Sequence, residues 1–356
     1  MKKRMKHVIA HREVPASTPR GAQADEGLWP LAEPFRIGHV EIANRVVQAP
    51  LAGIANWAFR AQSMRHGAGL AVSEMVASFG IHYANARTLT MLDTAHDARP
   101  VAIQIFGTEP EVMAEAALAV EAAGADLVDI NMGCPVNKVT KTGAGASLLA
   151  NEGERGAAII RAMVDAVKIP VMVKMRRGLT PESSRPVEAA KRFEDAGAAA
   201  ITFHPRAAAE EYAGRADHAI TASVAGAVDI PVIASGDITT PQQARDVFEQ
   251  TGCAAIAVGR AILGDPWLFT ALATGVGRER PALDEVVTEI ARFAAALDEA
   301  VGERRAAAEI RKYYAWYLAG YQIDRHVLGQ LQTDPTLDVA LARLRALSGS
   351  DVVTAA

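Results

Sequence analysis

Residues 125–147 read ADLVDINMGCPVNKVTKTGAGAS, and this stretch decides which fold we expect for the chain. Its opening letters, ADLVDIN, are apolar and rich in β-forming residues, which predicts a short buried strand. Asn131, Gly133 and Pro135 end that strand abruptly, because glycine allows unusual backbone angles and proline restricts both itself and Cys134 before it. The pattern therefore predicts a thiol on a short, rigid turn at the carboxyl end of a strand.

Similar short runs alternate with longer helical stretches from residue 36 onward. Gly124 and Gly197 follow the helical stretches 109–123 and 186–196, and glycine just past a helix is a common stop signal. Alternation repeated eight times predicts an α/β fold, a parallel (β/α)8 TIM barrel with right-handed crossovers. A doubly wound open sheet is the alternative, but no G-x-G-x-x-G motif follows the first strand. The expected strands are 45–49, 70–73, 101–106, 127–131, 171–175, 200–204, 232–235 and 255–258.

The alternation stops after Gly277, where apolar residues such as Val286 and Ile290 recur at helical spacing with no strand between them. We therefore expect a barrel domain at residues 28–277 and a C-terminal all-α helical domain at 278–350. Residues 1–27 are basic and lack the apolar core of a secretory signal. We interpret them as a disordered tail.

The run YYAWYLAGY at 313–321 holds four of the six tyrosines of the chain, beside Arg304, Arg305, Arg311 and Lys312. Basic groups interleaved with aromatic rings are typical of a nucleic-acid surface, where arginines contact phosphates and rings stack on bases. Alternatively, the rings form the core of the helical domain and the charges its solvated face. The pattern alone is compatible with both interpretations.

Composition limits the classes of function to consider. The net charge is −4, and no apolar stretch approaches the roughly 20 residues of a membrane span. The two cysteines, Cys134 and Cys253, form no CxxC pair, which argues against a disulfide scaffold or a structural zinc site and suits a reducing cytoplasm. We expect a cytoplasmic monomer without a bound metal or a membrane contact.

In a parallel barrel, functional side chains gather at the carboxyl ends of the strands. One of them, Lys174, interrupts the apolar strand VMVKM, and a lysine there is costly to bury without an anionic partner. Taken singly, the other polar residues also have structural explanations, as satisfied core groups. The candidates, in strand order, are Pro50, Leu51 and Ala52; Gln104; Asn131 and Cys134; Lys174 and Arg176; His204 and Arg206; Ser235, Gly236 and Asp237; and Gly259 and Arg260.

The last two strand ends predict a phosphate site. After Gly236, Thr240-Pro241 has the cap and first-turn proline of a helix start, and Gly259-Arg260 is expected to open another helix. Helix N-termini and glycine amides after strands 7 and 8 are the usual phosphate site of a barrel. A phosphate there, a lysine inside the barrel and a flat ring over residues 50–52 predict bound flavin mononucleotide (FMN).

The strand-end motifs of the sequence resemble those of the bacterial tRNA-dihydrouridine synthases, and most of all those of the B subgroup. They keep their order and spacing over residues 49–321 and are together very specific. Two departures are Ser235, where asparagine is common in the family, and Pro205, where glycine is common. The motifs are APLAGIANWAFR, EMVAS, VAIQIFG, VDINMGCPVNKV, VMVKMRRG, ITFHPR, VIASGDIT, AVGRAILGDPWLF and IRKYYAWYLAGY.

The resemblance implies an FMN-bound barrel, a tRNA-binding helical domain and NADPH as reductant. In that family hydride passes from the flavin to carbon 6 of a tRNA uracil, and a cysteine donates a proton to carbon 5. Carried over, Cys134 is the proton donor, since a free thiol has a pKa of about 8.5 and is mostly protonated near neutrality. Asn131 would hold the uracil, with Arg176 and Arg206 near it or the phosphates. The flavin contacts would be Pro50, Leu51, Ala52, Gln104, Lys174, His204, Ser235, Gly236, Asp237, Gly259 and Arg260.

Two other functions remain open from the sequence. A flavin barrel that acts on a free pyrimidine, as a dihydroorotate dehydrogenase does, would carry a similar site but would not need a basic-aromatic helical domain. A flavin- or RNA-binding regulator without catalysis would not need both Cys134 and Lys174.

Overall fold

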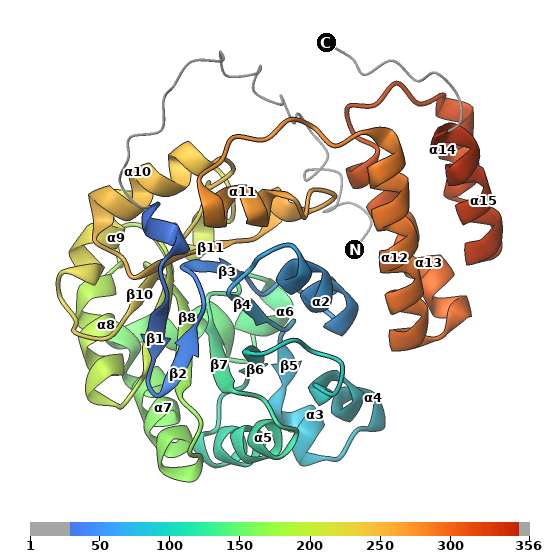
Figure 1. Ribbon diagram of the computed structural model, residues 1–356. Coiled ribbons are helices and arrows are strands. Elements are labelled where there is room, and N and C mark those ends of the chain that lie inside the picture. Colours follow the sequence, from blue (N-terminus) through green and yellow to red (C-terminus); the bar gives the residue numbers. More distant parts are fainter. Residues whose placement is uncertain (1–28, 349–356) are drawn as a thin grey trace.

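The computed structural model describes residues 29–348, and within them eight parallel strands close into a barrel (Figure 1). Each strand pairs with its neighbour in sequence, and pairing of the last with the first closes the ring. The TIM-barrel prediction is therefore confirmed, and every strand end lies within one residue of the expected position. The strands are β3 (Val46–Gln48), β4 (Leu70–Val72), β6 (Val101–Phe106), β7 (Leu127–Met132), β8 (Val171–Arg176), β9 (Ala200–His204), β10 (Val232–Ser235) and β11 (Ala255–Val258).

Alternation along each strand separates the barrel interior from the layer that faces the helices. On β7, Leu127 belongs to the interior cluster, whereas Val128 and Ile130 pack with residues of the surrounding helices. The interior cluster contains small and medium side chains such as Ala102, Met172 and Ala200, which fill the half of the barrel nearer the amino ends of the strands. A residue with the parity of Leu127 therefore points inward.

A short antiparallel hairpin, β1 (Phe35–Ile37) and β2 (Val40–Ile42), covers the amino end of the barrel (Figure 1). Its Phe35, Ile37 and Ile42 belong to the interior cluster, so this end is plugged by apolar side chains. Only the carboxyl end remains available for polar groups, as expected for this fold.

Helices and short 3-10 turns connect the strands and surround the barrel. The expected stretches 109–123 and 186–196 form α5 (Pro110–Ala122) and α8 (Pro186–Asp195). The remaining elements are η1 (Pro30–Ala32), α2 (Trp57–Arg65), β5 (Val76–Ala77), α3 (Ser78–His82), α4 (Ala86–Leu89), η2 (Thr90–Leu92), α6 (Asn137–Thr140), η3 (Gly145–Gly153), α7 (Glu154–Ala166), η4 (Ala208–Glu210), α9 (His218–Ala225), α10 (Pro241–Thr251), η5 (Arg260–Ile262) and α11 (Leu268–Thr274).

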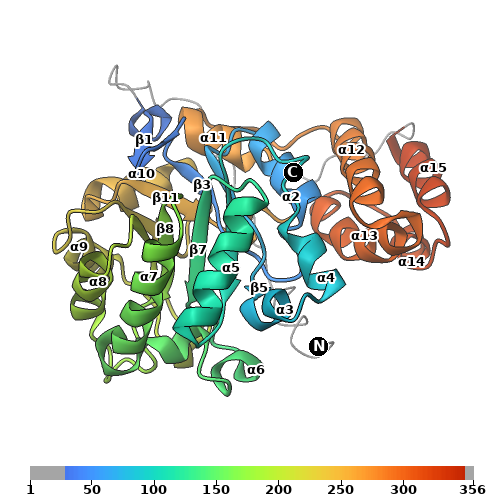
Figure 2. The same cartoon turned by 90° about the horizontal axis from the view of Figure 1, so that it is seen from below.

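Four helices follow the barrel and lie beside it (Figures 1 and 2): α12 (Leu283–Val301), α13 (Glu303–Tyr317), α14 (Arg325–Leu331) and α15 (Leu337–Ser348). Their core is continuous with the outer layer of the barrel, since Phe59 of α2, Phe293 of α12 and Tyr313 of α13 belong to one cluster. The ring centroids of Phe59 and Tyr313 are 6.4 Å apart, and those of Phe293 and Tyr313 are 4.8 Å apart. The helical region therefore shares its core with the barrel. The predicted tail at 1–27 and residues 349–350 lie outside the described residues.

The tyrosines of the 313–321 run form part of this shared core. Tyr313, Tyr314 and Tyr317 are at most 3% exposed, and Tyr321 is half-buried beneath Arg280. Rings in this position are unavailable to stack on bases. Of the two interpretations of the run, the structure favours the core.

A buried polar cluster joins the two regions. Glu289 of α12 is 4% exposed and accepts hydrogen bonds from Gln62 Nε2, at 2.6 Å, and from Arg65 Nη2, both on α2. Gln62 also donates to the hydroxyl of Tyr317. The carboxylate of Glu289 thus links α2 of the barrel to α12 and α13.

Replacing Glu289 with alanine is expected to lower the free energy of unfolding by about 3 kcal/mol, because it leaves the buried Gln62 amide without its acceptor and removes the ion pair with Arg65. The shared core predicts one unfolding transition for both regions, measured by urea denaturation followed by circular dichroism. Glu299→Ala on the same helix removes an exposed carboxylate and should change stability by less than about 0.5 kcal/mol. Equal losses in the two variants would contradict the proposed link.

Candidate active site

The polar residues predicted at the strand ends converge inside the carboxyl end of the barrel. Each shares its parity with an interior residue of its own strand, as Asn131 does with Leu127 and His204 with Ala200. The inward set is Gln104 on β6, Asn131 on β7, Lys174 and Arg176 on β8, His204 on β9 and Ser235 on β10.

Two of these side chains, Gln104 and Asn131, form a hydrogen-bonded row with a further inward side chain, Asp129. Gln104 Nε2 donates to Asp129 Oδ2 at 2.6 Å, and Asn131 Nδ2 donates to Gln104 Oε1 at 2.8 Å. Asn131 Oδ1 accepts from the backbone N–H groups of Gly133, at 3.2 Å, and Cys134, at 2.9 Å. Sequence reasoning missed Asp129, although a carboxylate at an inward position of a buried strand was a signal for it.

The Cys134 turn is supported from the other side by the small-residue stretch that follows it. Ala146 N donates to the Cys134 carbonyl at 3.1 Å, and a Cβ on Gly145 would lie 2.8 Å from the same oxygen. Gly145 also has φ +61°, which side-chain-bearing residues rarely adopt. The small residues of this stretch are therefore required for close packing against the thiol turn.

Cationic side chains surround His204. Burial, reinforced by the positive charges of Lys174, Arg176, Arg206 and Arg260, lowers the pKa of His204 to about 2, so its ring is neutral. His204 Nε2 lies 3.3 Å from Arg206 Nη1, a donor, which assigns the ring proton to Nδ1. The mouth of the barrel is thus a concentration of positive charge.

Lys174 is the innermost of these cations. It lies opposite Asn131 in the β7–β8 register, and no described residue accepts a hydrogen bond from its ammonium group. Burial and the nearby Arg176 lower the pKa of Lys174 to about 8, and the negative charge of Asp129 opposes that shift. A partly buried ammonium group without a hydrogen-bonding partner among the described residues is suited to an anionic or acceptor-rich ligand.

Arg206 and Asp237, predicted as ligand contacts, are bound to each other. Arg206 is 2% exposed, and its Nη1 and Nη2 donate to the two carboxylate oxygens of Asp237 at 3.0 and 2.7 Å. Its Nε donates to the Ala213 carbonyl and its Nη2 also to the Gly214 carbonyl. With His204 next to Nη1, all five N–H groups of Arg206 are directed at partners within the fold.

The loops after β10 and β11 differ from the expected pair of helix starts. Thr240 caps α10 as predicted, by accepting from Gln243 N, but Gly259-Arg260 opens only the three-residue turn η5. Gly236 packs against the His204 ring, where a Cβ would lie 2.8 Å from Cδ2. A Cβ on Gly259 would be in ordinary van der Waals contact with Leu51 Cδ2, at 3.5 Å, so this loop packs against the loop after β3.

The loop after β3 carries Pro50, Leu51 and Ala52 and is tied to both regions of the molecule. Gly53 N donates to Glu74 Oε2 at 2.8 Å, and the Gly53 carbonyl accepts from Lys312 Nζ of α13 at 2.6 Å. The side chains of residues 50–52 remain partly or fully exposed. The helical region thus helps to hold one edge of the site.

Exposed aromatic rings lie at the same end of the barrel as Cys134. Tyr83 is 74% exposed and Phe79 40%, and their rings stack with centroids 6.1 Å apart and planes 21° apart. They belong to α3 and the residue after it, which follow β5 at the end of the barrel opposite the hairpin (Figure 2). Tyr212, 54% exposed, stacks under Arg260 at 4.1 Å.

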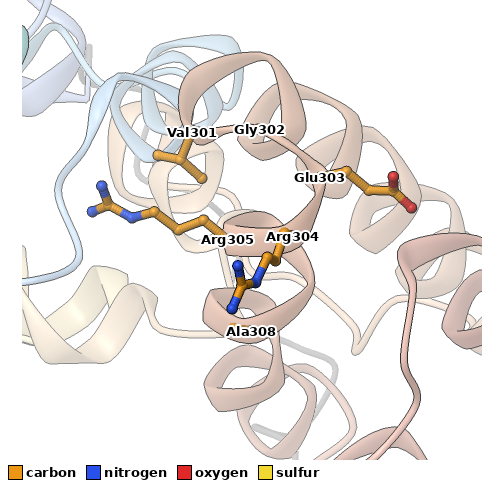
Figure 3. Close-up of a pocket in the computed structure, with 6 residues that line it drawn as sticks. All are labelled: Val301, Gly302, Glu303, Arg304, Arg305 and Ala308. Atoms are coloured by element: carbon orange, nitrogen blue, oxygen red, sulfur yellow. The ribbon is translucent and has the colours of Figure 1, made fainter.

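A separate surface hollow of about 450 Å³ lies at the turn between α12 and α13 (Figure 3). Arg304 and Arg305 extend to one side of the helix start and Glu303 to the other, and Arg305 pairs with Glu309 at 2.7 Å. Its lining residues, 301–305 and 308, all belong to the helical region, so this hollow is not part of the site built above.

Within residues 29–348, no helix is long and apolar enough to cross a membrane. No His, Cys, Asp and Glu side chains in this part of the chain gather in threes or more as a metal site would require.

Solved structures share the barrel at low sequence identity. A histamine dehydrogenase from Rhizobium sp. 4-9 superimposes with a TM-score of 0.56 at 14% identity, over 75% of this chain and 51% of that one. A morphinone reductase variant superimposes with a TM-score of 0.51 at 15% identity, over 70% of this chain and 92% of that one. These similarities support the fold.

Sequence comparison is more specific. The chain is 38% identical over 316 residues to tRNA-dihydrouridine synthase B of Xanthomonas axonopodis, covering 87% of this chain and 95% of the relative. It is 39% identical over 316 residues to the synthase B of Pseudomonas aeruginosa, covering 87% and 94%. The family model described as dihydrouridine synthase matches residues 47–347, which span both the barrel and the helical region. The chain therefore belongs to the dihydrouridine synthase family.

Proposed function

We propose that this chain is a tRNA-dihydrouridine synthase that holds FMN in its barrel, takes reducing equivalents from NADPH and uses Cys134 as the proton donor. The observation that carries the proposal is the position of Cys134, on a turn fixed by Asn131 Oδ1, beside the cations Lys174 and Arg176. A tRNA substrate implies a cytoplasmic location.

The residues at the barrel mouth fit FMN. Lys174, Arg176 and Arg260 supply more positive charge than Asp237, already paired with Arg206, can neutralise, and this excess suits a phosphate and an electron-rich ring. Lys174 has an ammonium group without a described acceptor. We assign the flavin ring to the side of the barrel lined by residues 50–52, Gln104 and Lys174.

Reduction of a uracil adds two hydrogens across its carbon 5–carbon 6 bond. When bound, the reduced flavin supplies the hydride for carbon 6. Cys134 donates its thiol proton to carbon 5, so the sulfur ends as a thiolate and takes up a proton from solvent before the next cycle. The charges of Lys174 and Arg176 favour that transient thiolate. NADPH and one proton are consumed for each dihydrouridine formed.

Asn131 has few hydrogen-bonding groups left for binding a uracil, because most of them already have partners in the fold. Its Oδ1 already accepts two backbone N–H groups, and one Nδ2 hydrogen is donated to Gln104. The second Nδ2 hydrogen faces only Met75 Sδ, at 3.7 Å. We therefore assign to Asn131 a single donated hydrogen bond to a uracil oxygen, in exchange for this weak contact.

The test is dihydrouridine content in unmodified tRNA transcripts after incubation with the purified protein and NADPH. We expect dihydrouridine at defined positions, with loss of uridine at the same positions. NADPH oxidation without tRNA product, but with product from free pyrimidines, would instead support a free-pyrimidine reductase. Native tRNA from a strain lacking the gene is the control for a requirement for earlier modifications.

The stacked pair Phe79 and Tyr83 is the aromatic surface that we propose for an unpaired tRNA base, in place of the buried tyrosines of α13. Removing the ring in Tyr83→Ala is expected to weaken tRNA binding about tenfold, since stacking of a base on an aromatic ring contributes about 1–3 kcal/mol. Tyr83→Phe keeps the ring and should bind as the wild type does. Leu118→Ala, an exposed apolar residue of α5, is the control for general surface effects. Unchanged tRNA affinity of Tyr83→Ala by filter binding would exclude this surface.

A further inference from the structure

The inward side chains of Asp129, Gln104 and Asn131, on β6 and β7, form a row of hydrogen bonds with a fixed order of donors and acceptors. At one end, the carboxylate of Asp129 accepts from Gln104 Nε2 at 2.6 Å. At the other end, Asn131 Oδ1 accepts the backbone N–H groups that begin the Cys134 turn. Between them, Asn131 donates to Gln104 at 2.8 Å. The row connects a buried carboxylate on the strand to the backbone of the thiol turn.

The direction is determined by the chemistry of the end group. Above its pKa of about 7, the Asp129 carboxylate can only accept hydrogen bonds, so Gln104 must present its NH2 group to Asp129 and its oxygen to Asn131. Asn131 must then present its NH2 group to Gln104, which leaves its oxygen for the turn. If either amide were reversed, two donors or two acceptors would face each other in a buried site. Asp129 at one end of the row and the backbone N–H groups of the turn at the other therefore specify the same two amide orientations.

Burial of the Asp129 carboxylate at this position costs folding free energy. It is 2% exposed, and its Oδ1 has no hydrogen-bond partner among the described residues. Burial raises the pKa of Asp129 to about 7, although the hydrogen bond from Gln104 and the charge of Lys174 oppose this shift. The interior residues around it, Leu127, Ala102 and Met172, are apolar, so an apolar side chain would suit packing better.

We propose that Asp129 is a positioning residue: its carboxylate orients the Gln104 and Asn131 amides, and Asn131 in turn holds the backbone of Cys134 in place for proton donation. The catalytic consequence rests on the proposed function, whereas the control of the Cys134 turn does not. The two can be separated by measuring the turn directly, through the reactivity of its thiol.

The experiment is a double-mutant cycle on Asp129 and Gln104, read by the rate at which iodoacetamide alkylates Cys134. Peptide mass spectrometry identifies the labelled residue, and Cys253, 2% exposed, serves as the internal unreactive thiol. The protein is used as isolated, with its cofactor. Met172→Leu, opposite Asp129 in the strand register, is the matched control because it changes the interior without removing a hydrogen bond.

Asp129→Asn replaces the acceptor with an amide that can face Gln104 in either orientation, and Cys134 is expected to be alkylated about fivefold faster. Gln104→Glu alone places two carboxylates side by side and should also increase the rate. In the double variant, the carboxylate introduced at position 104 can accept from the amide introduced at position 129 and from Asn131, which restores the orientation of Asn131. The rate of the double variant should return to within about twofold of the wild type.

Two results would overturn the proposal: a wild-type alkylation rate in Asp129→Asn, or a double variant at least as reactive as the faster single variant. The melting temperature gives an independent readout. A merely structural role would make Asp129→Asn less stable, whereas removing a half-partnered buried charge should leave the melting temperature unchanged or higher. In the active enzyme, kcat of Asp129→Asn should fall with KM for tRNA unchanged, because only the alignment of the proton donor is affected. If the alkylation rates of Cys134 follow the expected pattern but no dihydrouridine forms in tRNA, only the proposed function is contradicted.

Discussion

Replacing Cys134 with alanine is expected to reduce the rate of dihydrouridine formation by about 10²–10⁴-fold, the usual contribution of a positioned general acid. The thiol is the only acidic hydrogen carried by this turn, and no other described residue is placed by a hydrogen bond to Asn131 Oδ1 except its neighbour Gly133. Affinity for tRNA and for the flavin should remain near the wild-type values, because both depend on other side chains. Single-turnover reduction of a tRNA transcript isolates the affected step.

Cys253→Ala is the matched control for the loss of a thiol. Cys253 is 2% exposed and lies two residues before β11, at the amino end of the barrel and so at the opposite end of that strand from the polar mouth. Its removal should leave the rate unchanged. If Cys134→Ala forms product at the wild-type rate, another acid protonates carbon 5 and the role proposed for the thiol is wrong.

The barrel could be predicted from the sequence because its signals are local. Each strand is a short apolar run, and each helix is bounded by its own cap or glycine, as Gly124 follows α5. The inward residues could be named for the same reason, since parity along a strand and position at its carboxyl end follow from the sequence once the strand is placed. His204 and Lys174 were found in this way.

The pairings among those residues could not be predicted, because they depend on register between strands that are distant in sequence. Asp129 meets Gln104 only because residue 104 is aligned with residue 129 in the β6–β7 pairing. Arg206 and Asp237, both expected to contact ligands, satisfy each other instead across two loops. The tyrosines near 313 had a pattern that fits either a core or a surface, and only the packing of α13 on the barrel decides it.

Lys174→Met is expected to reduce the affinity for FMN by about 10–100-fold, the effect of losing one hydrogen bond to a charged group. Methionine retains the apolar stem within the barrel and removes the ammonium group, which has no acceptor among the described residues. Fluorescence titration of the apoprotein measures the affinity. Lys138→Met removes an exposed lysine of α6 and should bind FMN as the wild type does. Equal affinities of the wild type and Lys174→Met would contradict the assignment of Lys174 to the flavin.

The pH dependence of FMN binding gives a sharper test of the same residue. Because burial and Arg176 lower the pKa of Lys174 to about 8, its charge is lost as the pH rises through 8, and FMN affinity should fall over that range. Lys174→Arg stays charged to above pH 12 and should bind without this dependence. His204 and Asp129 also face Lys174: His204, with its pKa lowered to about 2, stays neutral over this range, and Asp129→Asn removes the Asp129 carboxylate, whose pKa is raised to about 7, from the titration. A Cys134→Ala background removes the nearby thiol from the titration.

The stability of the apoprotein should respond to pH in the opposite direction. An unfolded lysine has a pKa near 10.5, so between pH 8 and 10.5 the unfolded state binds more protons than the folded state. The contribution of Lys174 to the free energy of unfolding therefore rises with pH over that interval, while FMN affinity falls. Comparing wild type with Lys174→Met by urea denaturation at several pH values isolates this contribution. A parallel decline of stability and affinity above pH 8 would mean that alkaline unfolding, and not the charge of Lys174, limits binding.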